Sequence, residues 1–412
     1  MNYEAVVEEL YQRHRSVRDA GFSGEAYKPG LEAMRSYAAF IGNPERRFRS
    51  IHVAGTNGKG SVCSMIAAAL ASRGLRVGLY TSPHLVDFRE RIKIVTPSAG
   101  LPEFEMIPEE AVCRFLELYD RDGLTFFEVT TAMAMWWFAE SGVDVAVIET
   151  GLGGRLDSTN IIVPVLSVIT SIGLDHCDLL GSTRAEIAAE KAGIFKPGVP
   201  ALVWGRDPET QPVFERVAAS AGSPLFFAED WPEPPAVELD LAGPCQDGNL
   251  RTALAALDLL KIPVADCLPA LAHAARITGF RGRWEVLLDN PLIICDIGHN
   301  PPAIKANCAR LAELKRPLII VYGAMADKDV DSISHYLPQN AEYYLVQPAT
   351  PRAMSVGMLA LKLKKDHTVE AGTVAQGVEQ ALERAQAIPG AVVFIGGSTF
   401  VVSEAIKHIE AQ

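Results

Sequence analysis

Two α/β domains, each with a sheet of mainly parallel strands, are predicted from three features of the sequence. At 412 residues the chain is too long for one ordinary domain core. Short apolar runs alternate with helix-forming segments along most of it, a pattern typical of parallel strands with helices on both faces of the sheet. The alternation forms two series, separated by the turn-rich, arginine-bearing segment "GFRGRWEVL" at residues 279–287.

The first series follows a largely helical stretch that ends at the turn "GNP", residues 42–44. "SIHVA", residues 50–54, is predicted as a buried strand, and "SVCSMIAAALASRG", residues 61–74, as a helix that stops at Gly74. Further strands are expected at "LRVGLYTS" (75–82), "DVAVIET" (144–150), "VLSVITS" (165–171) and "ALVWG" (201–205).

The second series begins near Pro291 and ends in a final helix. Its strands are expected at "PLIICDIG" (291–298), "PLIIVYGAM" (317–325), "EYYLVQ" (342–347) and "AVVFIGGS" (391–398). We therefore expect one domain over residues 1–283 and a smaller one over residues 284–412. Ligands of such folds bind outside the carboxyl ends of the strands, so a cleft between the two domains is the expected binding place.

Composition excludes several classes of partner. The chain has 38 basic and 50 acidic residues, which gives a net charge of −12. This charge argues against nucleic acid or an anionic membrane surface as the main partner. The start "MNYEAVVEEL" lacks a basic segment followed by an apolar one, and the most apolar stretches are too short to span a bilayer. The seven cysteines are scattered, without a C-x-x-C pair. We expect a cytoplasmic protein with reduced thiols.

The segment "HVAGTNGKGSV", residues 52–62, has the composition of a phosphate-binding loop. Glycines let backbone N–H groups approach an anion, the following helix adds its dipole, and the lysine supplies a point charge. The spacing is shorter than the general G-x-x-x-x-G-K-[ST], so on pattern alone a plain glycine turn stays possible. The residues predicted to hold a nucleotide here are Gly55, Thr56, Asn57, Gly58, Lys59, Gly60 and Ser61.

Eight motifs in one order resemble the folylpolyglutamate synthase / dihydrofolate synthase family, within the wider Mur ligase superfamily. They are "IHVAGTNGKGSV", "YTSPHL", "RERI", "FFEVTTAMAMWWF", "ETGLGGRLDSTN", "GLDH", "EKAGIFK" and "DIGHNP". The resemblance implies an N-terminal P-loop ATPase domain of the Mur ligase type and a smaller, Rossmann-like C-terminal ligase domain. It implies ATP-dependent addition of L-glutamate to dihydropteroate, to the γ-glutamyl tail of reduced folates, or to both, through an acyl phosphate, by a monomer without nucleic-acid or membrane partners.

The same resemblance implies two Mg²⁺ ions beside the ATP. The metal ligands would be Ser82, Glu149, His176 and a carbamylated Lys191, and the catalytic residues would be Lys59, Glu149, His176 and Lys191. Each has a plainer alternative: a turn serine before proline, a solvated carboxylate at a strand end, a loop histidine, or a helical lysine paired with Glu186 or Glu190. Because magnesium prefers oxygen ligands, a histidine ligand would also admit manganese.

Nucleotide contacts outside the loop are implied in both domains. They are Gln246, Asn249, Arg283, Asp296 and His299. For the first two, a helix start with polar caps is the alternative. One departure matters: the family more often has proline and glycine before the arginine, whereas here Arg281 precedes Gly282. The choice between Arg281 and Arg283 as the phosphate contact therefore stays open.

The folate side of the site is implied around two loops. Its predicted residues are Ser82, Pro83, His84, Gly154, Arg155 and Asp157. Arg155 suits a carboxylate or phosphate, although a structural arginine is equally consistent with the sequence. Two other functions compete: another Mur-type ligase, such as one building peptidoglycan precursors, and a non-catalytic ATP-binding regulator. Threonine usually follows the loop lysine in the former, whereas Gly60 and Ser61 follow it here, and the latter has no need of a second metal site.

Overall fold

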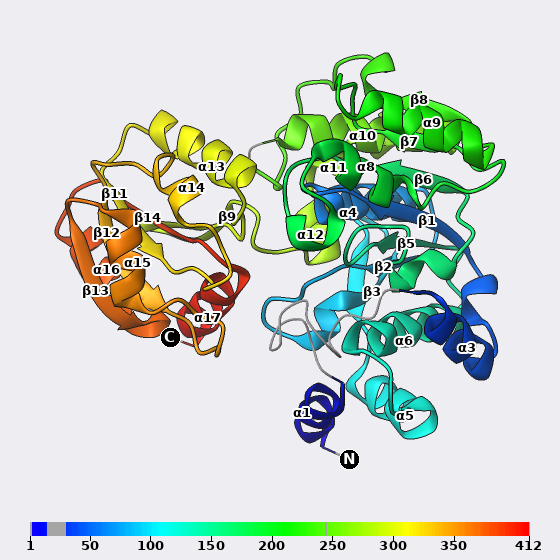
Figure 1. The fold of residues 1–412 in the computed structure, drawn as a ribbon, viewed down its shortest axis with the longest axis horizontal. Coiled ribbons are helices and arrows are strands. Elements are labelled where there is room, and N and C mark those ends of the chain that lie inside the picture. The colour runs from blue at the N-terminus through cyan, green and yellow to red at the C-terminus, as the bar shows by residue number, and fades with distance from the viewer. Residues whose placement is uncertain (1, 15–29, 244, 412) are drawn as a thin grey trace. The chain divides into compact units, whose positions relative to one another are not determined.

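The computed structural model describes residues 2–14, 30–243 and 245–411. The chain forms two compact units. Met1–Asp240 and Gln246–Phe280 make up the first, and Leu241–Cys245 and Arg281–Gln412 the second. Each unit has its own parallel-rich sheet with helices around it (Figure 1). The predicted α/β class is confirmed.

Eight strands form one sheet in the described part of the first unit, in the order β4-β3-β2-β5-β1-β6-β7-β8. All neighbours pair in parallel except β2 with β3 and β3 with β4. Every residue of β5 is buried, as is every residue of β1 except the first, because helices cover both faces of the sheet. The strands are β1 (Arg49–Ala54), β2 (Val77–Tyr80), β3 (Ile92–Thr96), β4 (Glu103–Met106), β5 (Val145–Glu149), β6 (Leu166–Ile169), β7 (Ala201–Val203) and β8 (Leu225–Phe227).

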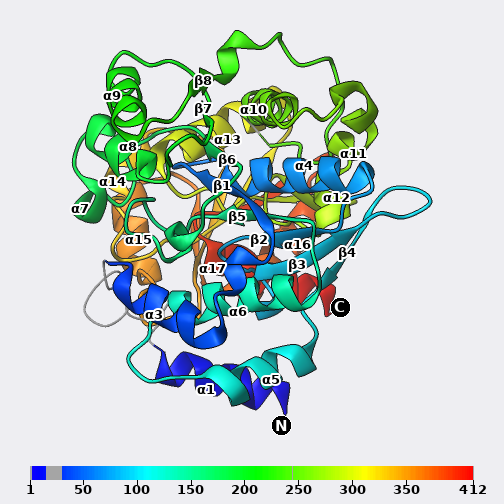
Figure 2. The ribbon, with the colours of Figure 1, turned by 90° about the vertical axis from the view of Figure 1, so that its right-hand side faces the viewer.

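Helices cover the two faces of this sheet, as Figure 2 shows: α4, α10, α11 and α12 lie on one face and α6 and α3 on the other. α4 is alanine-rich and buried from Gly60 to Ala71, which lets its neighbours approach closely. The helices are α1 (Tyr3–Arg13), α3 (Glu32–Ile41), α4 (Lys59–Ser72), α5 (Glu109–Tyr119), α6 (Phe126–Glu140), α7 (Cys177–Leu180), α8 (Arg184–Ala192), α9 (Gln211–Ala221), α10 (Gln246–Leu259), α11 (Leu268–Ala272) and α12 (Ala274–Thr278).

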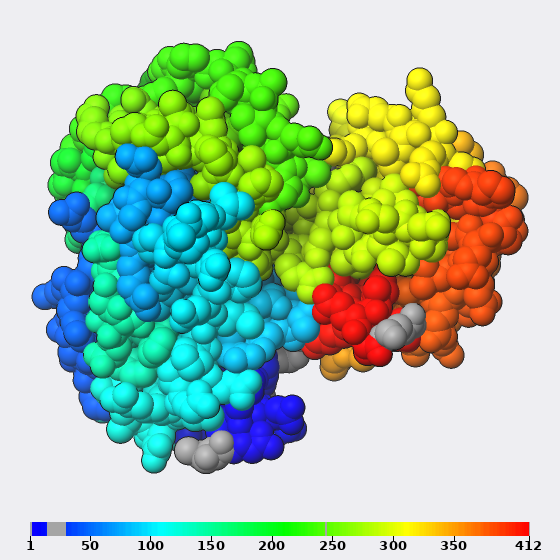
Figure 3. Space-filling view, turned by 180° about the vertical axis from the view of Figure 1, so that it is seen from behind, coloured from blue at the N-terminus to red at the C-terminus, as the bar shows by residue number. Residues whose placement is uncertain are grey.

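A buried lysine joins α12 to the β3–β4 hairpin. α12 packs on β3 and β4, and the cyan surface of this part of the first unit faces the viewer in Figure 3. Lys93 on β3 is 2% exposed, and its Nζ donates to the carbonyl oxygens of Thr278 (2.8 Å) and Gly279 (3.0 Å). These are carbonyls at the C-terminal end of α12, which a cation satisfies well.

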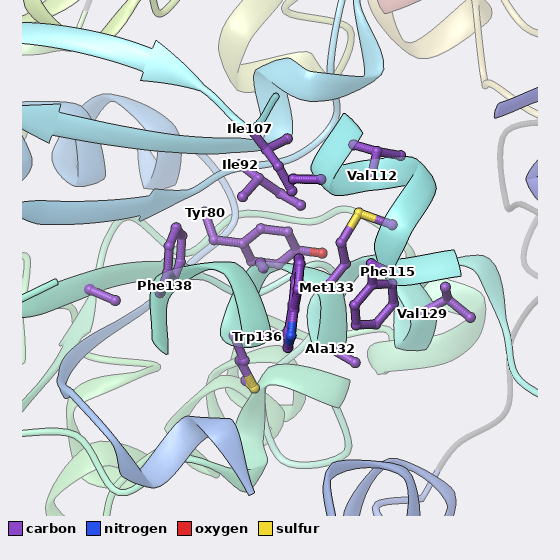
Figure 4. Close-up of a cluster of buried hydrophobic side chains, with 14 of the residues drawn as sticks. Tyr80, Ile92, Ile107, Val112, Phe115, Val129, Ala132, Met133, Trp136 and Phe138 are labelled. Carbon is purple, nitrogen blue, oxygen red and sulfur yellow. The ribbon is translucent and has the colours of Figure 1, made fainter. Parts of the chain in front are cut away.

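The core on the other face of the sheet is shown in Figure 4. Side chains from β2, β3, α5 and α6 meet there, among them Tyr80, Phe115, Met133, Trp136 and Phe138. The hydroxyl of Tyr80 forms hydrogen bonds with the Thr130 and Thr131 hydroxyls, at 3.2 and 3.1 Å. This packing holds the carboxyl end of β2, from which Ser82 follows.

The second unit has a six-stranded sheet in its described part, in the order β13-β12-β11-β14-β10-β9, with only β9 antiparallel to its neighbour. The four predicted strands are confirmed as β10, β11, β12 and β14; β9 and β13 were not predicted. The elements are β9 (Glu285–Asp289), β10 (Leu292–Cys295), α13 (Pro301–Glu313), β11 (Leu318–Tyr322), α14 (Asp331–Ser334), β12 (Glu342–Gln347), α15 (Val356–Leu363), β13 (Thr368–Thr373), α16 (Val374–Gln386), β14 (Val392–Gly396) and α17 (Thr399–Glu410). Across both units, no helix in the described ranges has the length and apolar character needed to cross a membrane.

Candidate active site

The predicted phosphate loop, residues 55–58, connects the central strand β1 to α4. Gly55 has φ 151°, and a Cβ there would lie 1.8 Å from Thr170 Oγ1, so the position requires glycine. Gly58, with φ 90°, precedes α4, whose first turn has no side-chain cap. The N–H groups of that turn are the donors that an anion at a helix N-terminus uses.

The segment after β6 braces this loop. Thr56 N donates to Ser171 O (2.8 Å), and Ser171 Oγ donates to Asn57 O (3.1 Å). The Thr56 hydroxyl donates to Gly173 O (3.1 Å) and accepts from Gly173 N (3.0 Å). The loop is therefore shaped by the segment after β6 as well as by its own glycines. Ser171 and Gly173 were not among the predicted site residues, because nothing in the local sequence marks a partner more than a hundred residues away.

Lys59 and Glu149 meet beside the loop. Lys59 Nζ donates to Thr56 O (3.3 Å) and lies 3.9 Å from Glu149 Oε1. Glu149 is 3% exposed at the end of β5, directly opposite Val53 of β1, and its Oε2 accepts from Ser82 N (3.0 Å). The ends of three neighbouring strands thus bring a cation, a carboxylate and the Ser82 segment together.

Lys191 contacts the phosphate loop directly. It lies on α8, is 4% exposed, and its Nζ donates to Gly55 O at 2.7 Å. Burial, together with the charge of Lys59, lowers the pKa of Lys191 to about 7. Neither glutamate that the sequence offered as a partner takes that role in its described contacts, because Glu186 caps α8 with Thr183 and Glu190 pairs with Arg155.

His176 follows the bracing segment and is the N-cap residue that precedes α7. Its backbone N donates to Asp175 Oδ1 (3.0 Å), and its Nε2 lies 3.8 Å from the same oxygen. In the described ranges, no group of three or more His, Cys, Asp or Glu residues is arranged to hold a metal ion. The predicted ligand set includes only two residues of those types, His176 and Glu149, and depends on Ser82 and a modified Lys191 for the rest.

Gln246 and Asn249, the predicted adenine-side amides, lie in the first turn of α10. Gln246 Nε2 donates to Ser61 Oγ (3.4 Å), and Asn249 Nδ2 donates to Gln246 Oε1 (2.9 Å). A Cβ on Gly58 would lie 2.3 Å from Asn249 Oδ1. The start of α10 therefore contacts the predicted phosphate loop and the first turn of α4.

The loop after Glu149 is anchored on α8. Arg155 forms a 2.8 Å ion pair with Glu190, while its side chain stays 56% exposed. A Cβ on Gly154 would lie 2.7 Å from Lys191 O. Asp157 is buried and accepts from the backbone N of Leu152 (2.8 Å) and of Thr159 (3.0 Å). Burial raises the pKa of Asp157, and this effect outweighs the hydrogen bonds, which lower it.

Asp157 is also part of a hydrogen-bonded series of polar side chains that was not predicted from the sequence. Thr159 Oγ1 donates to Asp157 and lies 2.8 Å from Nε2 of His52, which is fully buried in β1. Burial lowers the pKa of His52 to about 3, so its imidazole is neutral. The sequence feature that could have indicated this buried contact is the histidine within the mainly apolar run "SIHVA".

His84, a predicted folate contact, is 9% exposed. Arg91 Nε donates to its Nδ1 (2.7 Å), which makes Nδ1 an acceptor and directs the Nε2 hydrogen toward the Tyr11 hydroxyl (3.1 Å). Tyr11 stacks on Phe126, with ring centroids 4.9 Å apart. Arg91 belongs to the motif "RERI", for which no role was predicted. Pro83, the predicted folate contact next to His84 in the sequence, is exposed.

Arg283, Asp296 and His299 lie in the second unit. Asp296 Oδ2 accepts from Trp284 N (2.9 Å) and its Oδ1 from Gly298 N (2.7 Å), so the carboxylate shapes its own loop. His299 Nδ1 lies 3.1 Å from the carbonyl oxygen of Ile297, to which it donates.

Arg281, the other arginine of this segment, is engaged in ion pairs within the same unit. Its guanidinium lies 2.7 Å from Glu285 and 2.7 Å from Glu410. Both carboxylates that pair with the Arg281 guanidinium therefore belong to its own unit.

Comparisons with known proteins identify related chains and structures. The Mur ligase middle domain family matches residues 53–229, and the Mur ligase, glutamate ligase domain family matches residues 282–399. The chain is 36% identical to the folylpolyglutamate synthase of Lacticaseibacillus casei, over 76% of this chain and 80% of that protein.

Two solved structures are similar along nearly the whole chain. The Escherichia coli FolC in complex with DHPP and ADP has a TM-score of 0.83 and 29% identity, over 99% of this chain and 98% of that one. A bifunctional folylpolyglutamate synthase/dihydrofolate synthase with Mn, AMPPNP and L-glutamate bound has a TM-score of 0.83 and 30% identity, over the same shares.

Proposed function

The chain belongs to the folylpolyglutamate synthase and dihydrofolate synthase family of Mur ligases, and we propose that it joins L-glutamate to a folate-type carboxylate with ATP. The carboxylate would be that of dihydropteroate, that of the γ-glutamyl tail of a reduced folate, or both. The observation that carries the proposal is the meeting of Lys59, Glu149 and Lys191 at one glycine loop. Related proteins in complex with ADP and DHPP, or with AMPPNP, Mn and L-glutamate, support it.

The loop suits the first chemical step, the transfer of the γ-phosphoryl group of ATP to the substrate carboxylate. That transfer depends on positioning and charge stabilisation, with little covalent help from the protein. Lys59, held between Thr56 O and Glu149, keeps its ammonium at the loop before the nucleotide arrives. The uncapped first turn of α4 provides N–H groups for the same phosphates. The amine of L-glutamate would then displace phosphate from the acyl phosphate.

Magnesium fits the residues at the strand ends. Glu149 and Ser82 offer oxygen ligands on adjacent segments, and His176 would complete the first site. When bound, the metal would neutralise phosphate charge and orient the transferring group. Manganese in a related structure agrees with a site that includes a histidine. The ligand residues themselves remain our proposal.

A carbamate on Lys191 would hold the second magnesium. Its formation requires a neutral amine, which takes up CO₂ and releases one proton to give an anionic carbamate. Lys191 is buried and contacts a carbonyl oxygen of the loop, an environment that disfavours the ammonium form. The modified side chain would carry its oxygens from α8 toward the phosphates at the loop.

For the remaining nucleotide contacts we propose Gln246 and Asn249 in the first unit and Arg283, Asp296 and His299 in the second. Arg283 is proposed as the phosphate contact because it occupies the position in "FRGRW" that matches the family's arginine. The folate contacts that we propose are Ser82, Pro83, His84, Gly154, Arg155 and Asp157. The net charge of −12 supports the absence of nucleic-acid and anionic-membrane partners, and the proposal takes the protein as a cytoplasmic monomer.

One assay tests the proposal and separates its variants. Purified protein receives ATP, magnesium and labelled L-glutamate, with dihydropteroate or tetrahydrofolate offered in parallel. Label in the folate product, with one ADP per bond formed, is the expected result, and the two acceptors distinguish the two activities. ATP binding without any ADP formation would indicate a regulator. Turnover only with a peptidoglycan precursor and its amino acid would indicate a different Mur ligase.

A further inference from the structure

Trp204 is a large aromatic residue that stays 38% exposed at the end of β7. Trp136 and Trp284, by contrast, are 4% and 5% exposed and belong to the hydrophobic cores. Trp204 N donates to Ile169 O of β6 at 2.8 Å, so its side chain starts at the carboxyl edge of the sheet. β1, β5, β6 and β7 run parallel, and this edge therefore also carries the phosphate loop and Glu149. Ligands of such sheets bind at that edge.

The indole of Trp204 lies against the first turn of α10. A Cβ on Gly248 would be 2.5 Å from Trp204 Nε1 and 2.9 Å from Cε2 and Cζ2, so only glycine leaves room for the ring. The next residue, Asn249, abuts Gly58 of the phosphate loop. A continuous contact therefore runs from Gly58 through Asn249 and Gly248 to the indole, entirely within the first unit.

We infer that Trp204 is the stacking surface for the base of the nucleotide whose phosphates bind at residues 55–61. The inference rests on the proposed ATP site and adds a residue that binds the base. Phosphates at the loop leave the base to one side, where an apolar, aromatic ligand face needs an apolar protein face. One side of the indole is supported by Gly248, while the exposed part is available to stack. Any base can stack on an aromatic ring, but the larger ring system of a purine offers more stacking area than that of a pyrimidine.

The experiment uses the full chain with Mg-ADP and with Mg-tripolyphosphate, a probe that has phosphates but no base. Calorimetry measures both affinities, and tryptophan fluorescence is recorded during the ADP titration. The variants are Trp204→Ala and Trp204→Phe, with Trp231→Phe as the matched control. Trp231 is another partly exposed tryptophan of the first unit, and its Nε1 donates to Asp258 Oδ2 (3.1 Å).

Trp204→Ala is expected to weaken ADP binding by about 5- to 150-fold, the range that loss of one stacked base gives. Its affinity for tripolyphosphate should stay within about twofold, as expected for a residue away from the phosphates. ADP should quench the fluorescence of the unmodified protein and of Trp231→Phe. The quench should vanish in Trp204→Phe, whose smaller ring keeps most of the affinity.

Equal ADP affinity in Trp204→Ala and the unmodified protein would overturn the inference. An undiminished quench in Trp204→Phe would do so too, and that test stands even if the alanine variant fails to fold. Equal weakening of ADP and tripolyphosphate in Trp204→Ala would assign Trp204 a structural role and also count against it. An unmodified protein that binds neither probe would refute the proposed nucleotide site itself, a result distinct from the other three.

Discussion

The side-chain nitrogen of Lys191 donates a 2.7 Å hydrogen bond to the carbonyl oxygen of Gly55, the first residue of the phosphate loop. For this buried lysine, desolvation and the charge of Lys59 disfavour the ammonium form more than the nearby carboxylates of Asp175 and Asp157 favour it. Its pKa is accordingly lowered to about 7, mainly by burial. The same contact places the amine beside the loop that we propose to bind the phosphates, which is the geometric basis of the proposed carbamate.

Lys191→Ala is expected to lose ligase activity by more than the roughly 10- to 100-fold that removing an outer partner of a metal site costs. Sodium formate should restore part of it, because a free carboxylate can occupy the vacated metal position. Lys191→Arg should stay inactive with formate, since arginine keeps its charge and its volume. The measurement is the initial rate of ADP formation, with Lys305→Ala, an exposed lysine on α13, as control. Full activity of Lys191→Ala would contradict the carbamate.

Lys59→Ala should lower turnover by about 10²- to 10³-fold, the cost of removing one preorganised group that stabilises transition-state charge. The fold should persist, because the described contacts of Lys59 are one carbonyl oxygen and one 3.9 Å ion pair. kcat and the KM for ATP are measured separately, and thermal unfolding checks the fold. A variant with normal kcat and only a higher KM would mean that Lys59 binds ATP without acting on the transferring phosphate.

Arg283→Ala and Arg281→Ala are expected to fail in different ways. Loss of Arg283 should raise the KM for ATP and lower kcat, because a charge on the phosphates is removed. Loss of Arg281 should chiefly destabilise the second unit, by about 1 kcal/mol, because partly exposed pairs with Glu285 and Glu410 are broken. Steady-state kinetics measure kcat and the KM for ATP of both variants, and denaturant unfolding measures the free energy of unfolding of both. The reverse pattern would assign the phosphate contact to Arg281.

Lys93 should make stability depend on alkaline pH. Burial lowers its pKa to about 8 in the folded protein, whereas an unfolded lysine has a pKa of about 10.4. Between these values the unfolded chain binds a proton that the folded one does not, so the free energy of unfolding rises with pH. The rise is at most about 1.4 kcal/mol per pH unit and ends above about pH 10.4.

The matched variant for this test is Lys93→Met, which has a similar shape and no titrating group. Both proteins are unfolded with urea at a series of pH values from about 7 to about 10.5. The free energy difference between them should change across this window in favour of the lysine as pH increases. A difference independent of pH would show that Lys93 titrates normally.

Much of the fold was predictable because the central strands are almost wholly buried. β1, β5, β6 and β14 consist mainly of apolar residues, as expected for parallel strands covered on both faces. The edge elements escaped prediction: β4 is almost wholly exposed and carries "EFEM", and β13 alternates weakly. Short strands at a sheet edge bury little, so their sequences carry little periodic signal.

The local chemistry of the candidate site was likewise readable from the residues. Gly55, Gly58 and Lys59 lie within five positions, and Glu149 ends an apolar strand, so strand and loop rules alone bring them to one edge of a sheet. Partners distant in sequence were not readable. Lys191 and Gly55 are 136 residues apart, and nothing near Lys191 excluded a pairing with Glu190.

Packing determined which partners several side chains have. Arg281 pairs with the nearby Glu285 and with the distant Glu410, Glu190 pairs with Arg155, and Trp204 lies against Gly248 while staying partly exposed. Periodicity and local propensity act over one or two turns of chain, and they specify strands, helices and glycine loops. A side chain's partner depends on which distant segments the sheet order brings beside it, and that order arises only when the whole core packs.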